Sequence, residues 1–473
     1  MIQYDENLIR NVVAQVLAEV GPMPAADSSQ VGGKNGVFYD ADSAVTAARA
    51  AFEQFRDRPM ADRKRVIDVI RRISIEQCEE LGQMEMDETK IGRLEHKIEK
   101  LRTLGEQTPG VEFLETRAFS GDHGLAIIER APFGVIGAIT PVTHSLPTIT
   151  GNAVSMIAGG NAVVVNPHPS GKHVATEGVR RFNDAIAAEV GIDNLICVIA
   201  EPTLQSAEAL FKHRDVALIC VTGGPAVGRA ALNSGKRAIV AGPGNPPVVV
   251  DDTADLDLAA RSIIAGAAYD NNLLCIAEKE VFVVDSVFDA MMDAMRRAGA
   301  VQLSAEQIDQ LTSKAIIKVG DDQHDAACPD FIGRDASVLA AAAGVSVPLD
   351  TELVFGETDE HHPFVSVEQM MPFVPFVRAR DVDHAIAMAK EYEHGFRHTA
   401  IIHSRNVRNM TKMGRELDTT LYVKNGPCMA SLGLGGEGYL SFSIAGPTGE
   451  GVTTPTTFTR ERRCSMIDEL RVV

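Results

Sequence analysis

Cys275 is the residue whose neighbours are best suited to nucleophilic chemistry. It stands in the segment NNLLCIAEKE (residues 271–280), after two amides and two leucines and before a charged run. Backbone N–H groups at a helix-to-loop transition, together with side-chain amides, stabilise a thiolate or an oxyanion. A free thiol has a pKa of about 8.5, so such groups decide how nucleophilic it is at neutral pH. Taken alone, a cysteine beside leucines is more often a buried core residue.

Two glycine turns precede Cys275 and are suited to binding phosphate groups. In the first, residues 217–228 (ALICVTGGPAVG), a buried strand leads through two glycines into a helix. Such a turn directs unpaired N–H groups and the positive end of a helix dipole at a ligand. Because it lacks the GxGxxG pattern, it also fits an ordinary strand-to-helix turn. The second turn, AGPGNPP, covers residues 241–247.

Strands and helices alternate around these turns. The predicted strands are 134–139, 161–166, 195–199 and 217–222, and the predicted helices between them are 173–189 and 204–212. This alternation predicts an α/β fold with a doubly wound parallel sheet, which binds nucleotides at the carboxyl ends of its strands. A dinucleotide site is therefore expected near Asn166 and Thr222.

Further elements are predicted on both sides of this block. They are helices at 44–55, 64–80 and 95–104, a hairpin at 118–129, a second strand–helix block from 247 to about 420 that includes 247–250, 256–269 and 280–284, and a tail at 453–463. The tail is β-branched, so we predict an edge strand that pairs with another subunit. Hairpin and tail together predict a homo-oligomer, either a dimer or a tetramer.

The composition of the chain excludes several classes of protein. The 473 residues are 45% apolar, which allows two or three domains, and the net charge of −19 with no long basic run disfavours nucleic acid as a partner. No apolar run reaches the roughly 18 residues that a membrane span requires. The seven cysteines form no CxxC pair, which disfavours a zinc ribbon or disulfide framework and indicates a reducing compartment. We expect no metal site, although His361 and His362 lie beside two acidic residues.

The first residues of the chain form a separate segment. Residues 5–20 place apolar side chains on one stripe of a helix, and the following residues are rich in glycine, proline and serine. We therefore predict an amphipathic helix within residues 1–20 and a flexible linker at 21–37. An isolated helix of this length is marginal in water, so its apolar face is expected to dock. Two alternatives stay open for what it docks on. One is its own chain or an oligomer neighbour, and the other is a separate shell or scaffold protein.

Several motifs together resemble the aldehyde dehydrogenase superfamily. VTGGPAVGRAA, the second glycine turn, NNLLC and EQMMP (368–372) occur in its order and spacing. The chain is most similar to the CoA-acylating propionaldehyde and acetaldehyde dehydrogenases of bacterial microcompartments, through NPHPSGK (166–172), AGPGNPP (241–247), NNLLCIAEKEV (271–281) and the stretch at 357–365. The resemblance covers residues 38–473.

The resemblance implies an aldehyde dehydrogenase-like fold with three parts. These are a Rossmann-type nucleotide-binding domain (38–116 and 134–246), an α/β catalytic domain (247–446) and a small β oligomerisation arm (117–133 and 447–473). Residues 1–20 look like the encapsulation peptides of that group. The implied location is the lumen of a bacterial microcompartment in the cytoplasm, with shell or core proteins as partners.

The resemblance also implies a reaction. Cys275 would attack an aldehyde to form a thiohemiacetal, hydride would pass to NAD⁺, and the resulting thioester would be transferred to coenzyme A. Hydrolytic relatives carry a glutamate in the second glycine turn, whereas residues 239–245 hold no carboxylate. Without that base, acyl-CoA rather than free acid is expected. The expected cofactor-binding residues are Thr140, Pro141, Asn166, Pro167, His168, Thr222, Gly223, Gly224, Val227, Gly242, Gly244 and Glu368, the last matching a ribose-binding glutamate.

The oxyanion donor departs from the family pattern. Relatives place an asparagine near His144, so this histidine is predicted to donate through its ring N–H, or Thr143 and the Cys275 backbone N–H suffice. Three alternatives stay open: a hydrolytic aldehyde dehydrogenase, a Cys/His acyltransferase without redox chemistry, and a non-catalytic assembly protein. Propionaldehyde is favoured over acetaldehyde or lactaldehyde, and NAD over NADP.

Overall fold

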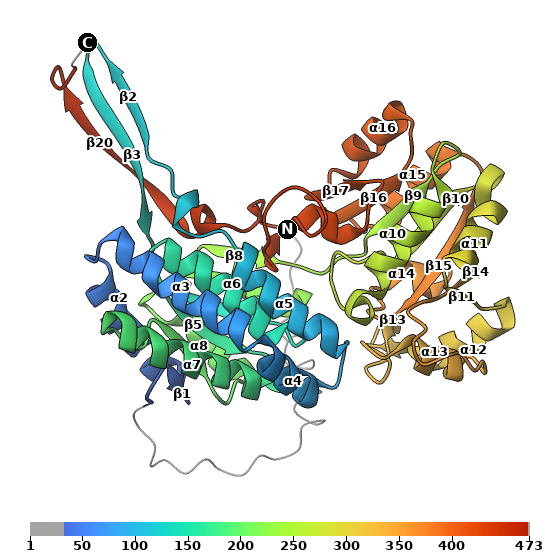
Figure 1. Cartoon of the computed structure of the whole chain (residues 1–473), viewed down its shortest axis with the longest axis horizontal. Coiled ribbons are helices and arrows are strands. Elements are labelled where there is room, and N and C mark those ends of the chain that lie inside the picture. The colour runs from blue at the N-terminus through green and yellow to red at the C-terminus, as the bar shows by residue number, and fades with distance from the viewer. Residues whose placement is uncertain (1–32, 472–473) are drawn as a thin grey trace. The chain divides into compact units, whose positions relative to one another are not determined.

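The computed structural model describes residues 33–471, which are built mainly around two parallel sheets (Figure 1). The predicted helix at 1–20 and most of the linker at 21–37 lie outside the described residues. Within them, the predicted α/β architecture is confirmed. The alternation of short apolar strands with amphipathic helices produces two parallel sheets, because each crossover helix returns the chain to the end of the sheet at which its strands begin.

The first sheet has six parallel strands in the order β1-β6-β5-β4-β7-β8. The chain runs outward from β4 to β5 and β6, then returns to place β7 on the other side of β4. Such a reversal of strand order opens a crevice at the carboxyl ends of the strands. The bounds are β1 (Val37–Phe38), β4 (Val135–Thr140), β5 (Ala162–Pro167), β6 (Ile196–Ile199), β7 (Val216–Thr222) and β8 (Ala238–Ala241).

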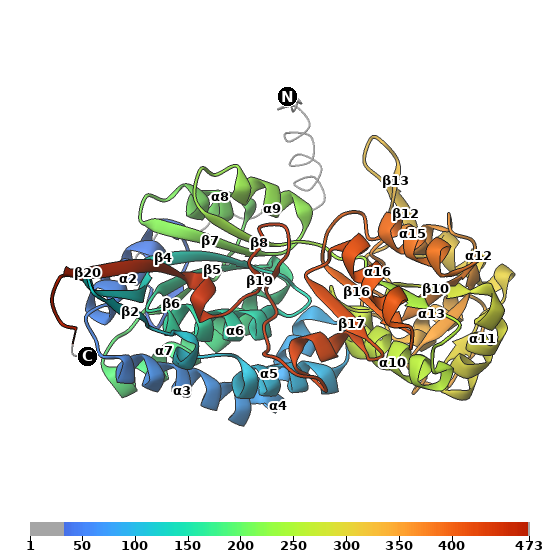
Figure 2. The ribbon, with the colours of Figure 1, turned by 90° about the horizontal axis from the view of Figure 1, so that it is seen from above.

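Helices cover both faces of this sheet (Figure 2). On one face α3, α6 and α7 contact one another, and on the other α2 contacts α8. The bounds are α2 (Ala41–Phe55), α3 (Met60–Glu76), α4 (Cys78–Thr89), α5 (Leu94–Gln107), α6 (Ser145–Ala158), α7 (Lys172–Val190), α8 (Leu204–Lys212) and α9 (Pro225–Leu232). The single helix predicted at 64–80 is wrong. The chain breaks at Gln77, whose φ of −112° and ψ of 14° are not helical, while the apolar period continues across the break.

The second sheet has seven parallel strands in the order β11-β14-β15-β10-β9-β16-β17. The central strands β9 and β10 are buried along their whole length, as apolar runs between two helical layers should be. The strand bounds are β9 (Pro247–Val250), β10 (Glu280–Val284), β11 (Val301–Gln302), β14 (Val354–Thr358), β15 (Phe373–Ala379), β16 (Thr399–His403) and β17 (Leu421–Lys424). The strands predicted at 247–250 and 280–284 are confirmed.

Helices α10 and α11 contact each other, and α15 contacts α16 and strands β9 and β10. The helix bounds are α10 (Leu256–Ala268), α11 (Phe288–Arg297), α12 (Ala305–Ala315), α13 (Ala336–Ala342), α14 (Pro363–Ser366), α15 (Val382–Tyr392) and α16 (Val407–Leu417). Two short antiparallel sheets have two strands each: β12 (Ile316–Val319) with β13 (His324–Ala327), and β18 (Ile444–Ala445) with β19 (Gly451–Val452).

A three-stranded antiparallel sheet joins two distant parts of the chain (Figure 1). The predicted hairpin is confirmed as β2 (Arg117–Gly121) and β3 (Gly124–Pro132), and β20 (Thr459–Ile467) pairs with β3. The tail strand predicted at 453–463 is confirmed from Thr459 onward, where β20 begins, and is wrong before that residue. Residues Pro455–Phe458 form a 3₁₀ turn with a capping box, because proline lacks the N–H that a ladder needs. The tail was predicted to pair with another subunit, whereas β20 pairs with β3 of its own chain.

Candidate functional site

The segment before Cys275 has an unusual backbone. After α10 the chain forms the short turn Tyr269–Asn272, in which Asp270, Asn271 and Asn272 have φ values of 49°, 54° and 66°. Side chains other than glycine rarely adopt this left-handed region, and asparagine and aspartate tolerate it best. The two asparagines of the motif therefore have a structural reason to precede the cysteine.

The amide side chains of this turn hold the loop and do not donate to the thiol. Asn271 donates from Nδ2 to Asp335 Oδ1 at 2.8 Å and to the Gly333 carbonyl at 3.0 Å. Asn272 donates to the carbonyl of Glu278 at 3.0 Å, across the cysteine loop. The expectation that these amides stabilise a thiolate is wrong, because their N–H groups already donate to Asp335 and to backbone carbonyl groups.

Cys275 is half-buried and lies against the second glycine turn. A side-chain carbon at Gly244 would collide with the Cys275 carbonyl oxygen, so the close approach requires glycine. The Gly244 N–H donates to Glu368 Oε1 at 3.3 Å. Burial, together with the negative charge of Glu368, raises the pKa of Cys275 to about 12. The resting side chain is therefore a thiol.

Lys279 is a buried cation four residues after the cysteine. Its Nζ donates to the Asn272 carbonyl at 2.9 Å and to the Leu274 carbonyl at 3.4 Å. Its positive charge lowers the pKa of Cys275 and opposes the effects of burial and Glu368. Lys279 thus fastens the loop and partly compensates the negative charge that the thiolate would bring.

His398 lies beside the same glycine turn, and the sequence reasoning missed it. A side-chain carbon at Gly244 would lie 3.1 Å from His398 Cγ. The ring is buried, its Nδ1 is 2.7 Å from Thr399 Oγ1, and within residues 33–471 its Nε2 has no hydrogen-bond partner. Burial, reinforced by Lys279, lowers the pKa of His398 to about 4, so the imidazole is neutral at pH 7. An unpartnered, neutral ring nitrogen is equipped to accept a proton.

A signal for His398 exists in the sequence but is incomplete. The residue stands directly before the apolar strand β16, which pairs in parallel with β9, the strand that follows the second glycine turn. Strands that pair in parallel bring their preceding residues to the same edge of the sheet. The pairing of β9 with β16 joins segments about 150 residues apart, and no local pattern reports it.

His144 and Thr143 lie in the loop between β4 and α6. His144 is buried at the start of α6, with Nδ1 3.2 Å from Lys100 Nζ and its ring 5.4 Å from that of Phe442. The Thr143 carbonyl accepts hydrogen bonds from Lys97 at 3.0 Å and Lys100 at 3.3 Å. Burial, with the charges of the two lysines, holds the pKa of His144 well below its usual range. No hydrogen bond joins His144 to Cys275 among the described residues.

The predicted dinucleotide-binding residues lie along the carboxyl edge of the six-stranded sheet. Thr140 pairs with Pro167, and Thr222 pairs with Ala241, in the ladders of adjacent strands. Helix α9 begins directly after Gly224, and no side chain caps its first N–H groups. The sequence-predicted residues occupy this edge as follows: Thr140 and Pro141 at the end of β4, Asn166, Pro167 and His168 at the end of β5, Thr222, Gly223 and Gly224 at the end of β7, Val227 in the first turn of α9, and Gly242 directly after β8.

Polar groups at this edge fit a dinucleotide. The Thr140 hydroxyl is buried and lacks a hydrogen-bond partner within the described part of the chain. Asn166 Oδ1 accepts from Ser206 Oγ at 2.5 Å, and Thr222 Oγ1 lies 2.8 Å from Ser443 Oγ. The free N–H groups and positive dipole at the start of α9 suit a phosphate, and the small residues allow its close approach.

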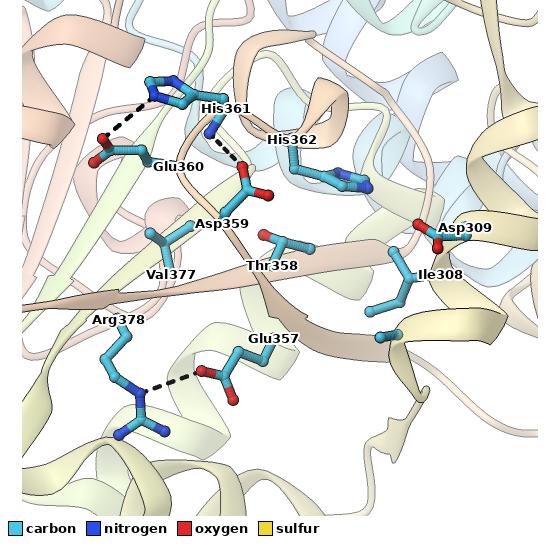
Figure 3. Close-up of a pocket in the computed structure, with 11 residues that line it drawn as sticks. Ile308, Asp309, Glu357, Thr358, Asp359, Glu360, His361, His362, Val377 and Arg378 are labelled. Atoms are coloured by element: carbon cyan, nitrogen blue, oxygen red, sulfur yellow. Dashed lines mark hydrogen bonds and ion pairs between the residues drawn. The ribbon is translucent and has the colours of Figure 1, made fainter.

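A cavity of about 640 Å³ lies at the end of the second sheet opposite to Cys275 (Figure 3). It follows the carboxyl ends of β14 and β15, whereas Cys275 precedes the amino end of the parallel strand β10. Its lining includes four acidic side chains and the ion pair of Arg378 with Glu357 at 3.2 Å. His361 Nε2 lies 3.6 Å from Glu360, and no group of three metal-ligating side chains is found within residues 33–471. The cavity is therefore not the site of the thiol chemistry.

Residues 33–471 contain no helix that is both long and apolar enough to span a membrane.

A family model matches most of the chain: residues 24–438 match the aldehyde dehydrogenase family. The acetaldehyde dehydrogenase (acetylating) EutE of Salmonella typhimurium is 44% identical over 469 residues, which cover 98% of this chain and 99% of the relative.

Two solved structures are also similar. The propionaldehyde dehydrogenase of Rhodopseudomonas palustris, with bound CoA and an acylated cysteine, is 42% identical with a TM-score of 0.89, covering 92% of this chain and 99% of that one. The propionaldehyde dehydrogenase from the fucose utilisation bacterial microcompartment of Clostridium phytofermentans is 42% identical with a TM-score of 0.89, covering 93% of this chain and 100% of that one. These likenesses confirm the fold that the sequence motifs implied.

Proposed function

Because the chain belongs to the aldehyde dehydrogenase family, we propose that it oxidises a short aliphatic aldehyde to acyl-CoA, with NAD⁺ as hydride acceptor and coenzyme A as acyl acceptor. One observation carries the proposal. Cys275 and the neutral ring of His398 both lie against Gly244, in a turn that holds no carboxylate from residue 239 to residue 245. The site therefore offers a nucleophile and a base without the carboxylate that activates water in hydrolytic relatives.

The first half of the reaction forms a thioester on Cys275. The thiol releases its proton to water as sulfur attacks the aldehyde carbon, because a pKa of about 12 leaves little free thiolate at pH 7. The attack gives a thiohemiacetal whose oxygen needs a hydrogen-bond donor, and the backbone N–H of Cys275 and the ring of His144 are the proposed donors. Bound NAD⁺ supplies the acceptor for the hydride that leaves this carbon. The carbon is oxidised and remains attached to sulfur as a thioester.

Glu368 and the edge of the six-stranded sheet position the nicotinamide half and the phosphates of the dinucleotide. Glu368 is fixed by the Gly244 N–H, and burial raises the pKa of its carboxyl. Within residues 33–471 no hydrogen bond is found at its second carboxyl oxygen, which is proposed to accept from a ribose hydroxyl. The N–H groups at the start of α9 are proposed to hold a phosphate, as free helix N-termini commonly do.

The second half transfers the acyl group to coenzyme A. His398 accepts the thiol proton of coenzyme A through Nε2, the new sulfur–carbon bond forms, and the bond to Cys275 breaks. The leaving sulfur recovers a proton, so Cys275 returns to its resting thiol. Water is a poor competitor because its activation needs a stronger or better placed base than the second glycine turn provides.

The aldehyde is proposed to have two to four carbons, with propionaldehyde ahead of acetaldehyde. A similar curated relative acts on acetaldehyde and two similar structures are propionaldehyde dehydrogenases, which supports this size range. The test is a panel of C2 to C4 aldehydes with NAD⁺ or NADP⁺, with and without coenzyme A, following reduced cofactor and acyl-CoA. We expect sustained turnover only with coenzyme A; sustained release of free acid without it would support the hydrolytic alternative.

The assembly of the protein is part of the same proposal. We propose the division into a nucleotide-binding domain (38–116 and 134–246), a catalytic domain (247–446) and an oligomerisation arm (117–133 and 447–473), with a dimer or tetramer formed through the arm. Residues 1–20 are proposed to attach the enzyme to a shell or core protein of a microcompartment in the cytoplasm. The origin of one similar structure supports this location. Fusing residues 1–20 to a fluorescent protein tests whether they are sufficient for encapsulation.

A further inference from the structure

Four charged side chains form a buried cluster between α4, α5 and the turn that precedes Cys275. The cluster consists of Glu85, Lys97, Lys100 and Asp270, and all four side chains are fully buried. Lys97 pairs with Glu85 at 3.2 Å, and Lys100 forms an ion pair with Asp270. Burying four charges is costly, and removing one partner leaves an uncompensated charge. The balance of two cations against two anions makes the cluster tolerable in this position.

The cluster is attached to the segment that carries Cys275. Asp270 is the first of the three left-handed residues, and its Oδ1 accepts from the Arg93 N–H at 2.8 Å. Although burial opposes it, the charges of Lys100 and Lys97 lower the pKa of Asp270 to about 2, so it is ionised. The position of the nucleophile's segment is thus linked to α5 through a charged contact.

The cluster is also attached to the loop that carries His144. Lys100 Nζ lies 3.2 Å from His144 Nδ1, and both lysines donate to the Thr143 carbonyl. Glu85 Oε2 accepts from the Leu146 N–H at 3.2 Å, in the first turn of α6. One buried cluster therefore contacts both the segment before the nucleophile and the proposed oxyanion donor.

The contact with Lys100 decides which nitrogen of His144 carries the proton. Burial lowers the pKa of Lys100, but the ion pair with Asp270 opposes this effect and holds the side chain as an ammonium group. An ammonium group only donates hydrogen bonds, so the neutral imidazole must present Nδ1 as the acceptor. The ring proton then resides on Nε2, where it is available as a donor. The opposite tautomer would turn an N–H toward the ammonium and leave an acceptor at Nε2.

We propose that Lys100 is a positioning residue that fixes His144 as the Nε2–H tautomer, and that Asp270 couples this donor to the Cys275 segment. The proposal rests on the proposed function for its catalytic meaning. The tautomer itself is a property of the free enzyme and is measured without turnover.

The charges around His144 predict how a variant should respond to pH. Lys97 and Lys100 on α5, Asp270 before Cys275 and Glu85 on α4 are the charged groups of the elements packed against this loop. Lys100→Met leaves one lysine against two carboxylates, so the pKa of His144 should rise, although the burial that chiefly lowers it remains. Without the ammonium group at Nδ1, the neutral ring is free to place its proton on that nitrogen, and the oxyanion then loses its donor.

The experiment compares Lys100→Met with Lys97→Met, a matched control that removes a buried lysine without touching the ring. Nitrogen-15 NMR of histidine-labelled enzyme, assigned with His144→Ala, should show Nε2–H in the wild type and in Lys97→Met, and loss of that tautomer in Lys100→Met. We expect kcat of Lys100→Met to fall about 10- to 100-fold, which is a smaller loss than that for a missing oxyanion donor. The KM for the aldehyde should change less than about threefold. The deficit relative to wild type should grow as the pH rises through the pKa of His144 in the variant, because only the neutral ring can change tautomer.

The outcomes separate this proposal from the proposed function. An Nδ1–H tautomer or a titrating imidazolium in the wild type overturns the proposal without any variant, so poor folding of a variant does not protect it. Equal losses of kcat with unchanged tautomers in the two lysine variants would also overturn it. Failure of the wild type to make acyl-CoA would instead overturn the proposed function, while the tautomer measurement would still report on Lys100.

Discussion

Both sides of the proposed site are built on parallel sheets, but they use opposite ends of the strands. The dinucleotide side uses the carboxyl ends of parallel strands, with glycine turns, hydroxyls and the start of α9. The cysteine side uses the segment before the amino end of β10, where Lys279 is fully buried and Glu368 and His398 are nearby. Backbone N–H groups bind with many small contributions, whereas buried charges act through a few large ones. Substitutions on the dinucleotide side should therefore have small effects on activity, and substitutions on the cysteine side should have large ones.

His398→Ala should show the largest effect among the partners of Cys275. A general base contributes about 10²- to 10⁴-fold, so transfer of the acyl group to coenzyme A should slow by a factor in that range. The first burst of NADH should persist, because thioester formation precedes the step that His398 assists. Rapid-quench kinetics measures both phases, and loss of the burst with the steady state would contradict this assignment.

His144→Ala should lower kcat about 10²- to 10³-fold, the usual cost of losing one oxyanion donor. The KM for the aldehyde should change little, because the hydrogen bond strengthens as the carbonyl oxygen becomes negative. Steady-state kinetics over a range of propionaldehyde concentrations checks this result. An unchanged kcat would leave the oxyanion to Thr143 and the Cys275 backbone N–H.

Alkylation of Cys275 should depend steeply on pH. Because burial and Glu368 raise the pKa of the thiol to about 12, the thiolate fraction should increase about tenfold for each pH unit up to that value. The rate of modification by iodoacetamide, followed by peptide mass spectrometry, should therefore show no plateau below pH 10. The exposed Cys464 is an accessible thiol in the same chain and controls for reagent decay. A plateau near pH 8 would show that free Cys275 is already activated.

Thr222→Val should have the smallest effect. It removes the hydroxyl that lies 2.8 Å from Ser443 Oγ but keeps the shape of the side chain. Losing one hydrogen bond of about 1 kcal/mol should raise the KM for NAD⁺ several-fold and leave kcat nearly unchanged. Ser443→Ala removes the partner and is the matched control. A fall in kcat as large as that of His144→Ala would remove the distinction between the two sides.

Local patterns were sufficient to predict, from the sequence, the strands, helices and turns of the proposed dinucleotide side. Helix α8 and strand β10 have the predicted bounds, and the glycine turn after Thr222 lies where the strand–helix alternation put it. A strand followed by glycines and a helix is contiguous in sequence, so its residue pattern reports its structure. The break at Gln77 was missed because an apolar period gives no signal where two amphipathic helices follow each other.

The cysteine side was predicted only in part. Cys275 and Glu368 were identified through family motifs, but His398 and the buried lysines were not. Lys100 and Asp270 are 170 positions apart, and the parallel pairing of β9 with β16 brings His398 to the glycine turn. These contacts depend on which helices and strands become neighbours, and a periodicity within one segment does not contain that information. The amides of Asn271 and Asn272 were misassigned because a local motif does not show which groups the turn itself must satisfy.

The most direct test of the central claim is the fate of the acyl group on Cys275. The enzyme is mixed with propionaldehyde and NAD⁺ without coenzyme A, and intact-protein mass spectrometry follows the acylated chain, with Cys275→Ala as the control. We predict one acyl group on the wild type and none on the variant, a slow loss in buffer, and rapid transfer to acyl-CoA when coenzyme A is added. Rapid loss of the acyl group as free propionate before coenzyme A is added would contradict the account.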